Sequence, residues 1–402
     1  MVTATATSTV TVPAAPIKEA KGILDSAGIQ FSNLDIHFRK GEDVIDPVTG
    51  VLKVADKEYS SAKYPEWLPT WDPSQKFAQY SDDFNKAYRD PGLDADPELR
   101  SLFPPQSKDK YSIKKLSPKL GSEIRGIQLS ELSTQAKNDL ALFVAQRGVV
   151  VFRNQDLKDK GLEFNKKLGE HFGPLHVHPS SGAPENYPQF HITYRRHDPE
   201  EYNKVFRKRT SLNDQWHSDC TFEKYTPSYT FFAMLDGPET GGDTIFSDCI
   251  EAYDRLSPTF QKMIHGLKAT HSSVEQATQS KNDGGIERRE PSTVVHPLVR
   301  VHPVLKKKAL YVSRFFMQDI EGLKKEESNA ILDLLTDHIN NSFDLQIRAS
   351  YEPGTVVVWD NRRVLHTATF DWDTGATRHC YRITPMGERP VEDEEELEEW
   401  NK

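Results

Sequence analysis

Between about residue 111 and residue 390, hydrophobic positions recur with the two spacings that distinguish helices from strands. From Ser133 to Arg147 the apolar residues lie three and four apart on one helical face, and Gly148 follows where a C-cap belongs. The next four residues, Val149–Phe152, are all apolar, which is typical of a buried strand. The sequence therefore predicts a helix over 133–147 followed directly by a core strand.

The same spacings predict further elements. One helix ends at Gly173-Pro174, one opens at Ser257-Pro258, and one covers residues 324–340. The inward face of the last is expected to comprise Ile331, Leu334, Leu335 and Ile339. Strand-like patterns occupy residues 229–236, 294–313 and 355–360, the last of them a central strand. The polar stretch 273–292 is expected to form a surface loop or lid.

This sequence of elements favours one fold class. Many short strands are interrupted by a few helices, and the pattern shows neither βαβ alternation nor an internal repeat. Such a chain is typical of a mainly β protein with helical additions. We therefore expect a jelly-roll core, that is, a double-stranded β-helix.

The distribution of polar and charged residues divides the chain into four parts. Residues 1–30 are Thr-, Ala- and Pro-rich and predict a disordered segment. Residues 31–110 are polar, Pro-rich and aromatic, which suggests an arm packed on the compact domain at 111–390. Residues 391–402 hold most of the net charge of −9, since the chain before them carries only about −3. This acidic end is expected to be a solvated tail or frayed helix.

The composition indicates the compartment and the kinds of partner to expect. Three cysteines without Cys-x-x-Cys spacing fit a reducing compartment and argue against a disulfide scaffold. No apolar run approaches the ~18–20 residues of a membrane span, and the first residues lack the features of a secretory signal. We therefore expect a cytoplasmic protein with no membrane partner. The charge balance does not favour nucleic acid, and a homo-oligomer is expected.

The strongest chemical signal is Trp216-His217-Ser218-Asp219, with His366 far downstream. His-x-Asp on an extended segment places an imidazole and a carboxylate on one side of the chain. A distant second histidine can complete one face of a metal's coordination sphere. Two histidines and one carboxylate suit Fe(II), because three positions stay open for a chelating co-substrate and O2. The triad of His217, Asp219 and His366 is the candidate metal site.

Other residues around the triad point to bound anions. Gly241-Gly242-Asp243-Thr244 follows the His-x-Asp segment, and Arg378 and Arg382 follow His366. Two arginines trailing a metal triad suggest iron together with two anionic ligands. His176 and His178 could also ligate a metal, or could be one core and one pocket histidine.

Together these motifs carry a family resemblance. The stretch from about Leu116 to Pro390 resembles the taurine dioxygenase family of Fe(II)/2-oxoglutarate oxygenases, and is most similar to the fungal sulfonate dioxygenases within it. The Trp-His-Ser-Asp, Gly-Gly-Asp-Thr, Trp-Asp-Asn-Arg…His and Arg-x-x-x-Arg motifs stand in the family's order and spacing. The resemblance implies that residues 111–390 form the catalytic jelly roll. It also implies that the triad holds iron.

The resemblance extends to the ligands of the iron centre. It implies that Thr244 and Arg378 hold the distal carboxylate of 2-oxoglutarate, although Thr244 could also be an ordinary strand threonine. Four residues match positions that contact the sulfonate substrate: His178, Asn213, Phe316 and Arg382. Phe316 could equally be a core residue. Ser181 departs from the family, because the bacterial taurine enzymes have a Tyr there, near the amine of taurine.

The implied activity is hydroxylation of the carbon next to sulfur in taurine or related alkylsulfonates. The products would be sulfite and an aldehyde, with succinate and CO2 from 2-oxoglutarate, and the sulfur would enter assimilation. Ser181 predicts a generalist that also accepts sulfonates without an amine. Alkyl sulfate esters and aryloxyalkanoates are alternative substrates, since both present an anion to Arg382. A non-enzymatic jelly roll that only binds anions is the remaining alternative.

Overall fold

A computed structural model describes residues 43–195, 215–282, 285–372 and 376–400 of the chain. The chain divides into two units, Met1–Phe31 and Ser32–Lys402. The first unit, and with it the disorder predicted for residues 1–30, lies outside the described residues.

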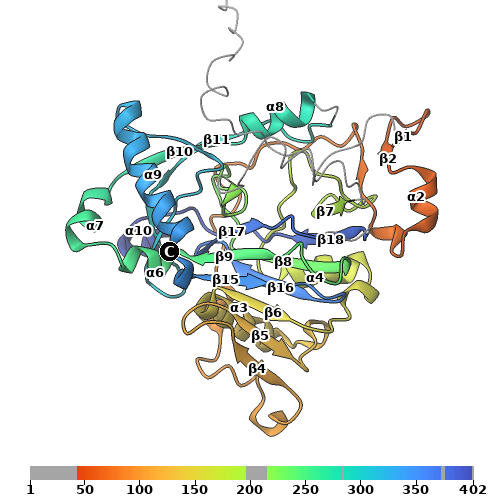
Figure 1. The fold of residues 1–402 in the computed structure, drawn as a ribbon, viewed down its shortest axis with the longest axis horizontal. Coiled ribbons are helices and arrows are strands. Elements are labelled where there is room, and N and C mark those ends of the chain that lie inside the picture. The colour runs from red at the N-terminus through yellow and green to blue at the C-terminus, as the bar shows by residue number, and fades with distance from the viewer. Residues whose placement is uncertain (1–42, 196–214, 283–284, 373–375, 401–402) are drawn as a thin grey trace, which may run out of the picture. The chain divides into compact units, whose positions relative to one another are not determined.

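A seven-stranded sheet forms the centre of the second unit (Figure 1). Its strands, in spatial order, are β4 (Ser112–Lys115), β5 (Ser122–Arg125), β6 (Val149–Phe152), β16 (Val356–Asp360), β8 (Tyr229–Asp236), β18 (Arg378–Ile383) and β7 (Phe190–Arg195). Strand β16 lies in the middle, as the apolar run at 355–360 predicts. Its neighbours β6 and β8 both pair with it antiparallel.

One βαβ unit lies within this sheet, although the sequence predicted no such alternation. Strands β5 and β6 pair in parallel, and α3 (Thr134–Arg147) connects them. The ends of α3 are those expected from the sequence. The side chain of Ser133 accepts a hydrogen bond from the backbone N–H of Ala136 at 3.1 Å, and Gly148 adopts φ +70°.

A smaller sheet covers one face of the large sheet. It contains β15 (Gln346–Ala349), β9 (Thr244–Asp248) and β17 (Val364–Ala368), in that order. A hydrophobic cluster joins the two sheets, with Val357 and Trp359 from the large one and Phe246 and Ile347 from the small one. Two facing sheets around one core, antiparallel except for the β5–β6 pair, are the two layers of a jelly roll.

The other face of the large sheet packs on helices. Side chains alternate along β16, so that Val356 and Val358 join a second cluster with α3 and α4 (Leu162–Glu170). Because both faces of β16 are covered, its sequence is an unbroken apolar run rather than an alternating one. The same holds for β6.

Residues 43–110 form short elements along the large sheet. They include β1 (Val44–Ile45), β2 (Leu52–Lys53), α2 (Asp56–Ser61) and β3 (Thr70–Trp71), besides three short 3-10 helices, Pro65–Trp67, Pro91–Asp94 and Pro105–Ser107. Trp67 is fully buried, and its ring stacks on that of Tyr381 of β18 with centroids 4.4 Å apart. Thr70 pairs with Ala183 in an isolated bridge. The exact limits of this arm stay a prediction.

Further helices and strands complete the unit. They are α6 (Cys249–Asp254), α7 (Pro258–Ile264), β10 (Lys268–Ser272), α8 (Val274–Asn282), β11 (Thr293–Pro297), β12 (Val299–Val301), β13 (Lys308–Leu310), β14 (Met317–Ile320), α9 (Lys325–Asn341) and α10 (Glu394–Trp400). None of the helices in the described ranges is long and apolar enough to cross a membrane.

Three details differ from the sequence-based expectations. The stretch predicted as a loop at 273–292 contains the helix α8. On α9, Leu334 is exposed, whereas Leu332 faces the core. The acidic end is tied down, because Val391 and Leu397 pack with Val301. The apolar residues of this segment outweigh its charge in deciding where it lies.

Candidate active site

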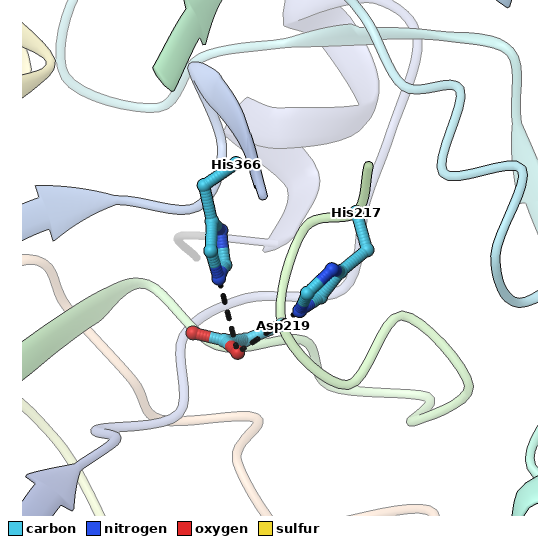
Figure 2. A group of neighbouring side chains, drawn as sticks. All are labelled: His217, Asp219 and His366. Atoms are coloured by element: carbon cyan, nitrogen blue, oxygen red, sulfur yellow. Dashed lines mark ion pairs between the residues drawn. The ribbon is translucent and has the colours of Figure 1, made fainter. Parts of the chain in front are cut away.

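His217, Asp219 and His366 come together although they are far apart in the sequence. Their ligand atoms all lie within 4.8 Å of one another. Nε2 of His217 is 4.0 Å and Nε2 of His366 is 3.9 Å from the same oxygen, Oδ1 of Asp219. Figure 2 shows both rings directed at the carboxylate. Among the described residues, no other group of three His, Cys, Asp or Glu side chains has the spacing of a metal site.

A short antiparallel bridge fixes the two histidines relative to each other. The backbone N–H of His217 donates to the carbonyl of His366 at 3.0 Å, and the N–H of His366 donates back at 2.8 Å. His217 thereby extends the small sheet beyond β17. Its Nδ1 donates to the carbonyl of Gln215 at 2.7 Å, which leaves Nε2 unprotonated and facing the metal position.

The third ligand, Asp219, is held by residues of the large sheet. Thr230 donates to Oδ2 of Asp219 at 2.7 Å, and Asn361 in turn donates to Thr230 at 2.9 Å. Oδ1 of Asn361 accepts the backbone N–H of Asp219 at 3.2 Å and Nε1 of Trp359 at 3.0 Å. The Trp-Asp-Asn motif therefore orients Asp219, the candidate metal ligand. Such supporting contacts are usual around metal-binding carboxylates.

The two arginines of the same motif anchor the segment that leads to His366. Arg362 is fully buried and donates to both oxygens of Asp360 at 2.8 and 2.7 Å, and it also pairs with Asp90. Arg363 donates to two backbone carbonyls in the last turn of α3, at 3.0 and 2.6 Å. A cation at a helix C-terminus is favourable because the carbonyls there lack helical partners.

Burial and neighbouring charges keep the two histidines neutral and Asp219 ionised, as a metal site requires. Burial lowers the pKa of His217, and burial followed by the effect of His217 lowers that of His366 to about 3. For Asp219, burial would raise the pKa, but Arg382, His366 and His217 outweigh it and hold the pKa below its usual value. Two neutral imidazoles and one carboxylate are the forms that bind metal. Nη1 of Arg382 donates to Oδ1 of Asp219 at 2.6 Å.

Arg378 is a second buried cation near the triad. Nη2 of Arg378 donates to the carbonyl of Gly242 at 3.2 Å, whereas Nε has no partner. The guanidinium lies 5.4 Å over the ring of Phe232 and 5.7 Å over that of Tyr351. No carboxylate in the described part of the chain forms an ion pair with it. A buried guanidinium without a counter-charge is a suitable anchor for an anionic ligand.

Tyr351 connects Arg378 with Thr244. Its hydroxyl lies 2.8 Å from Oγ1 of Thr244, and burial raises its pKa, so it stays protonated. Thr244 is two residues from Phe246 on β9, and Phe246 pairs with His366 of the neighbouring strand β17. The structure thus brings Thr244 and Arg378 together at one side of the triad. Sequence reasoning missed Tyr351, because nothing in its local pattern separates it from a core tyrosine.

His178 and His176 have different surroundings. Nδ1 of His178 accepts the backbone N–H groups of Ser180 and Ser181 at 3.3 and 3.1 Å, so its proton sits on Nε2. Burial, followed by His191 and Arg382, lowers the pKa of His178 well below the usual range, and it is a neutral donor at physiological pH. His176 instead bonds to the buried carboxylate of Glu223 at 2.9 Å.

Phe316 lies beside the triad. Its buried ring is 6.0 Å from that of His217 and 5.0 Å from that of Phe222, both in edge-on contact. Phe316 is therefore both a core residue and a neighbour of the candidate metal site. Asn213, which the sequence also assigns to the substrate, lies outside the described residues.

The fold and the site together define a class of protein. A jelly roll that presents two neutral imidazoles and an ionised carboxylate on one face is a non-haem metal enzyme of the two-His-one-carboxylate type. The donor set fits Fe(II), and the buried guanidinium of Arg378, with its unpartnered Nε, fits an anionic co-substrate.

The chain belongs to the taurine dioxygenase family. The profile described as "Taurine catabolism dioxygenase TauD, TfdA family" matches residues 112–384. The alpha-ketoglutarate-dependent sulfonate dioxygenase of Saccharomyces cerevisiae is 50% identical over 363 residues, 90% of this chain and 87% of the relative. The alpha-ketoglutarate-dependent dioxygenase cnsM of Penicillium expansum is 41% identical, over 83% of this chain and 92% of the relative.

A solved structure confirms the fold. The crystal structure of a taurine dioxygenase from Burkholderia xenovorans superposes with a TM-score of 0.58 at 28% identity, covering 71% of this chain and 92% of that chain. The family and the jelly roll predicted from the sequence are therefore both confirmed. The roles of individual site residues stay predictions.

Proposed function

We propose that this protein is an Fe(II)- and 2-oxoglutarate-dependent dioxygenase that oxidises the carbon next to sulfur in alkylsulfonates. Sulfite and an aldehyde are the products, with succinate and CO2 from 2-oxoglutarate, and the sulfite enters sulfur assimilation. One observation carries the proposal: two arginines on the inner face of β18, Arg378 and Arg382, accompany the one two-His-one-carboxylate group found among the described residues. The 50% identical yeast relative, a sulfonate dioxygenase by name, supports it.

His217, Asp219 and His366 would hold the iron. When bound, iron with 2-oxoglutarate and O2 supplies the oxidant for the C–H bond. The protein's own contribution to this step is to keep the ligands unprotonated and oriented, through Gln215 behind His217 and Thr230 behind Asp219.

Arg378, Thr244 and Tyr351 would bind the distal carboxylate of 2-oxoglutarate. The free Nε of Arg378 and the Thr244–Tyr351 hydroxyl pair offer donors of complementary kinds. Their place beside the triad would let one end of the co-substrate stay fixed while the other reaches the metal.

Arg382 and His178 would bind the sulfonate, with Phe316 as a further wall of the pocket. Asn213, which lies outside the described residues, stays a predicted substrate contact. A sulfonate is anionic at every physiological pH, so a permanent cation is a suitable partner. One N–H of Arg382 engages Asp219, and a guanidinium has five donors, so others can serve the substrate. Fixing the sulfonate this close to Asp219 places the adjoining C–H bond at the metal.

The proposal includes a compartment and an assembly. The three cysteines are buried and form no disulfide with one another, which suits the reducing cytosol. A homo-oligomer is expected and can be checked by light scattering of the purified protein.

The test is a product assay. Protein loaded anaerobically with Fe(II) is given 2-oxoglutarate, O2 and one substrate at a time from three classes: alkylsulfonates, alkyl sulfate esters and aryloxyacetates. We expect succinate and sulfite in equal amounts from alkylsulfonates. His217→Ala, Asp219→Ala and His366→Ala are the controls and should abolish both products. Release of sulfate or glyoxylate without sulfite would replace the sulfonate substrate by one of the other classes.

A further inference from the structure

Arg288 is a buried cation that the proposed mechanism does not use. Its residue is 1% exposed, and Nη2 donates to the backbone carbonyl of Thr70 at 3.1 Å. Nε and Nη1 have no hydrogen-bond partner, and no carboxylate of the described ranges forms an ion pair with it. Burial lowers the pKa of Arg288 to about 10, which Asp72 offsets only in part. An uncompensated buried charge costs several kcal/mol, so its retention calls for a reason.

The next residue shows how this chain treats a structural arginine. Arg289 is buried as well, but it pairs with Glu223 and also donates to Gln79 at 3.2 Å. The two neighbouring arginines therefore differ in whether the buried guanidinium has a carboxylate partner, which distinguishes a core ion pair from a candidate anion-binding site. Arg289 has its counter-charge within the protein, and Arg288 does not.

Backbone and side-chain contacts connect Arg288 to the segment that follows His178. Its backbone N–H donates to the carbonyl of Pro179 at 2.7 Å, next to His178. The carbonyl of Thr70 that accepts from its side chain also accepts the backbone N–H of Ala183 at 3.1 Å. Arg288 is thus clamped against residues 179–183, the segment that follows His178.

Two further buried side chains with unused polar atoms lie in the same place. His191 stands directly opposite Arg382 in the β7–β18 pair, and its ring is 4.9 Å from that of His178. Nδ1 of His191 and Oγ of Ser181 have no partner among the described residues. Directly paired residues project from the same face of a sheet, so His191 faces inward with Arg382. Arg288 is close enough to contribute to the lowered pKa of His191.

We propose that Arg288, Ser181 and His191 form a second anion site at the far end of the substrate pocket, and that it receives a carboxylate. The preferred substrates are then alkylsulfonates whose other end is a carboxylate. This inference rests on the proposed function, because it takes Arg382 and His178 as the sulfonate anchor. Charge pairing would satisfy the free N–H groups of Arg288, and the hydroxyl of Ser181 would complete the carboxylate's partners.

The chemistry of this end disfavours an amine. An ammonium would face a guanidinium and two neutral side chains, and no described carboxylate pairs with the cation there. The expected range of sulfonate substrates is therefore narrower than Ser181 alone predicts. The absence of the family's tyrosine opens the pocket to sulfonates without an amine, and Arg288 selects among them by charge.

A matched substrate series tests the proposal. The three compounds are 3-sulfopropanoate, propane-1-sulfonate and 3-aminopropane-1-sulfonate, which share the chain and the sulfonate and differ at the far end. We expect kcat/KM to fall in that order, by at least about tenfold from the carboxylate to the neutral compound. Anaerobic titration followed by visible absorption of the iron–2-oxoglutarate centre gives Kd values independent of turnover, and these should follow the same order.

Arg288→Met is the decisive variant. The ratio of kcat/KM for 3-sulfopropanoate to that for propane-1-sulfonate should fall to about one, whereas Arg288→Lys should keep part of it. Arg255→Met is the matched control, because Arg255 is a surface arginine paired with Asp344 at 2.8 Å, and the ratio should not change there.

The outcomes separate the two proposals. If none of the three sulfonates yields sulfite, the proposed function fails. If propane-1-sulfonate is a substrate but 3-sulfopropanoate is no better, the second anion site is wrong. An Arg288→Met protein that is less stable but keeps the wild-type ratio would also overturn it, because Arg288 would then be structural.

Discussion

Arg378 and Arg382 are four residues apart on one strand, and their side chains serve different ligands in the proposed site. Strand geometry separates them by about 13 Å along β18. That spacing lets one arginine pair with Asp219 while the other lies beside Tyr351 and Thr244. Because the two arginines contact different residues, substitutions of Arg378 and of Arg382 should affect the binding of different ligands.

We predict that Arg378→Ala raises the KM for 2-oxoglutarate far more than the KM for the sulfonate. Losing a charge-assisted contact in a buried site costs about 2–5 kcal/mol. Thr244→Val should raise the same constant by a smaller amount, because a neutral hydroxyl contributes less. Steady-state kinetics with each substrate varied in turn measures both. If only the sulfonate constant changed, the roles of Arg378 and Arg382 would have to be exchanged.

At this scale the sequence predicted the residues whose chemistry restricts the residue type. The type and spacing of His217, Asp219 and His366 predicted that they lie together, which the structure shows, and their role as metal ligands stays a prediction. Tyr351 and Arg288 could not be found, because their surroundings are made by segments distant in the sequence. An arginine next to another arginine gives no sign of which one is paired.

At the scale of elements, local signals predicted what local interactions decide. The caps of α3 and the apolar runs of β6 and β16 were readable, since each depends on neighbouring residues. The parallel pairing of β5 with β6 was not, and neither was the exposure of Leu334 on α9. Both depend on which surface the element meets after the chain has folded.

The turn before β9 illustrates an element that shapes the site. Gly242 adopts φ +66°, and a Cβ there would lie 3.2 Å from Nε of Arg378. A side chain at this position would therefore strain the backbone and press on the arginine. Gly266 adopts φ +82° but has nothing within 4 Å of its Cβ position.

We predict that Gly242→Ala raises the KM for 2-oxoglutarate at least several-fold, whereas Gly266→Ala leaves it unchanged. Both variants should lose about 1 kcal/mol of stability from the left-handed backbone. Thermal melts check the shared cost, and kinetics checks the difference. Equal kinetic behaviour of the two variants would show that Gly242 does not position Arg378.

At the scale of the whole described unit, a buried ionic network joins the N-terminal arm to the catalytic core. Asp90, which is 2% exposed, pairs with Arg362 and accepts a hydrogen bond from Tyr229 at 3.0 Å. Arg362 also holds Asp360, next to the residues that orient Asp219. The arm is therefore part of the framework behind the metal site.

We predict that Asp90→Ala lowers the free energy of unfolding by about 3–5 kcal/mol, because it leaves part of the charge of Arg362 unpaired. Asp94→Ala should lower it by less than about 1 kcal/mol, since Asp94 is exposed and its partner Arg89 is on the surface. Urea unfolding of both variants measures the difference. Similar losses would mean that the network adds little to stability.

We also predict that stability falls as the pH drops below about 6.5. Burial lowers the pKa of several histidines outside the metal site: His176, His178, His191, His271, His296, His302 and His379. In the unfolded chain they bind protons near pH 6.5, and in the native state only at lower pH. The unfolded state therefore binds more protons in this window, and acid favours it. Urea midpoints of metal-free protein at pH 8, 7, 6 and 5 should decrease, and constant midpoints would contradict the prediction.

The central position of β16 has a consequence for how the protein is made. Its partners β6 and β8 are synthesised long before it, and His366 must then meet His217 across a similar gap. A nascent chain on the ribosome therefore carries two apolar strands with open edges until the last part of translation. Contacts of such sequence separation form slowly, and open edges invite pairing with other chains. A chain that stops before residue 356 would lack His366 and Arg378, and it would also lack β16, the strand that joins the two halves of the large sheet. We expect such a chain to require chaperones rather than to fold into a smaller enzyme.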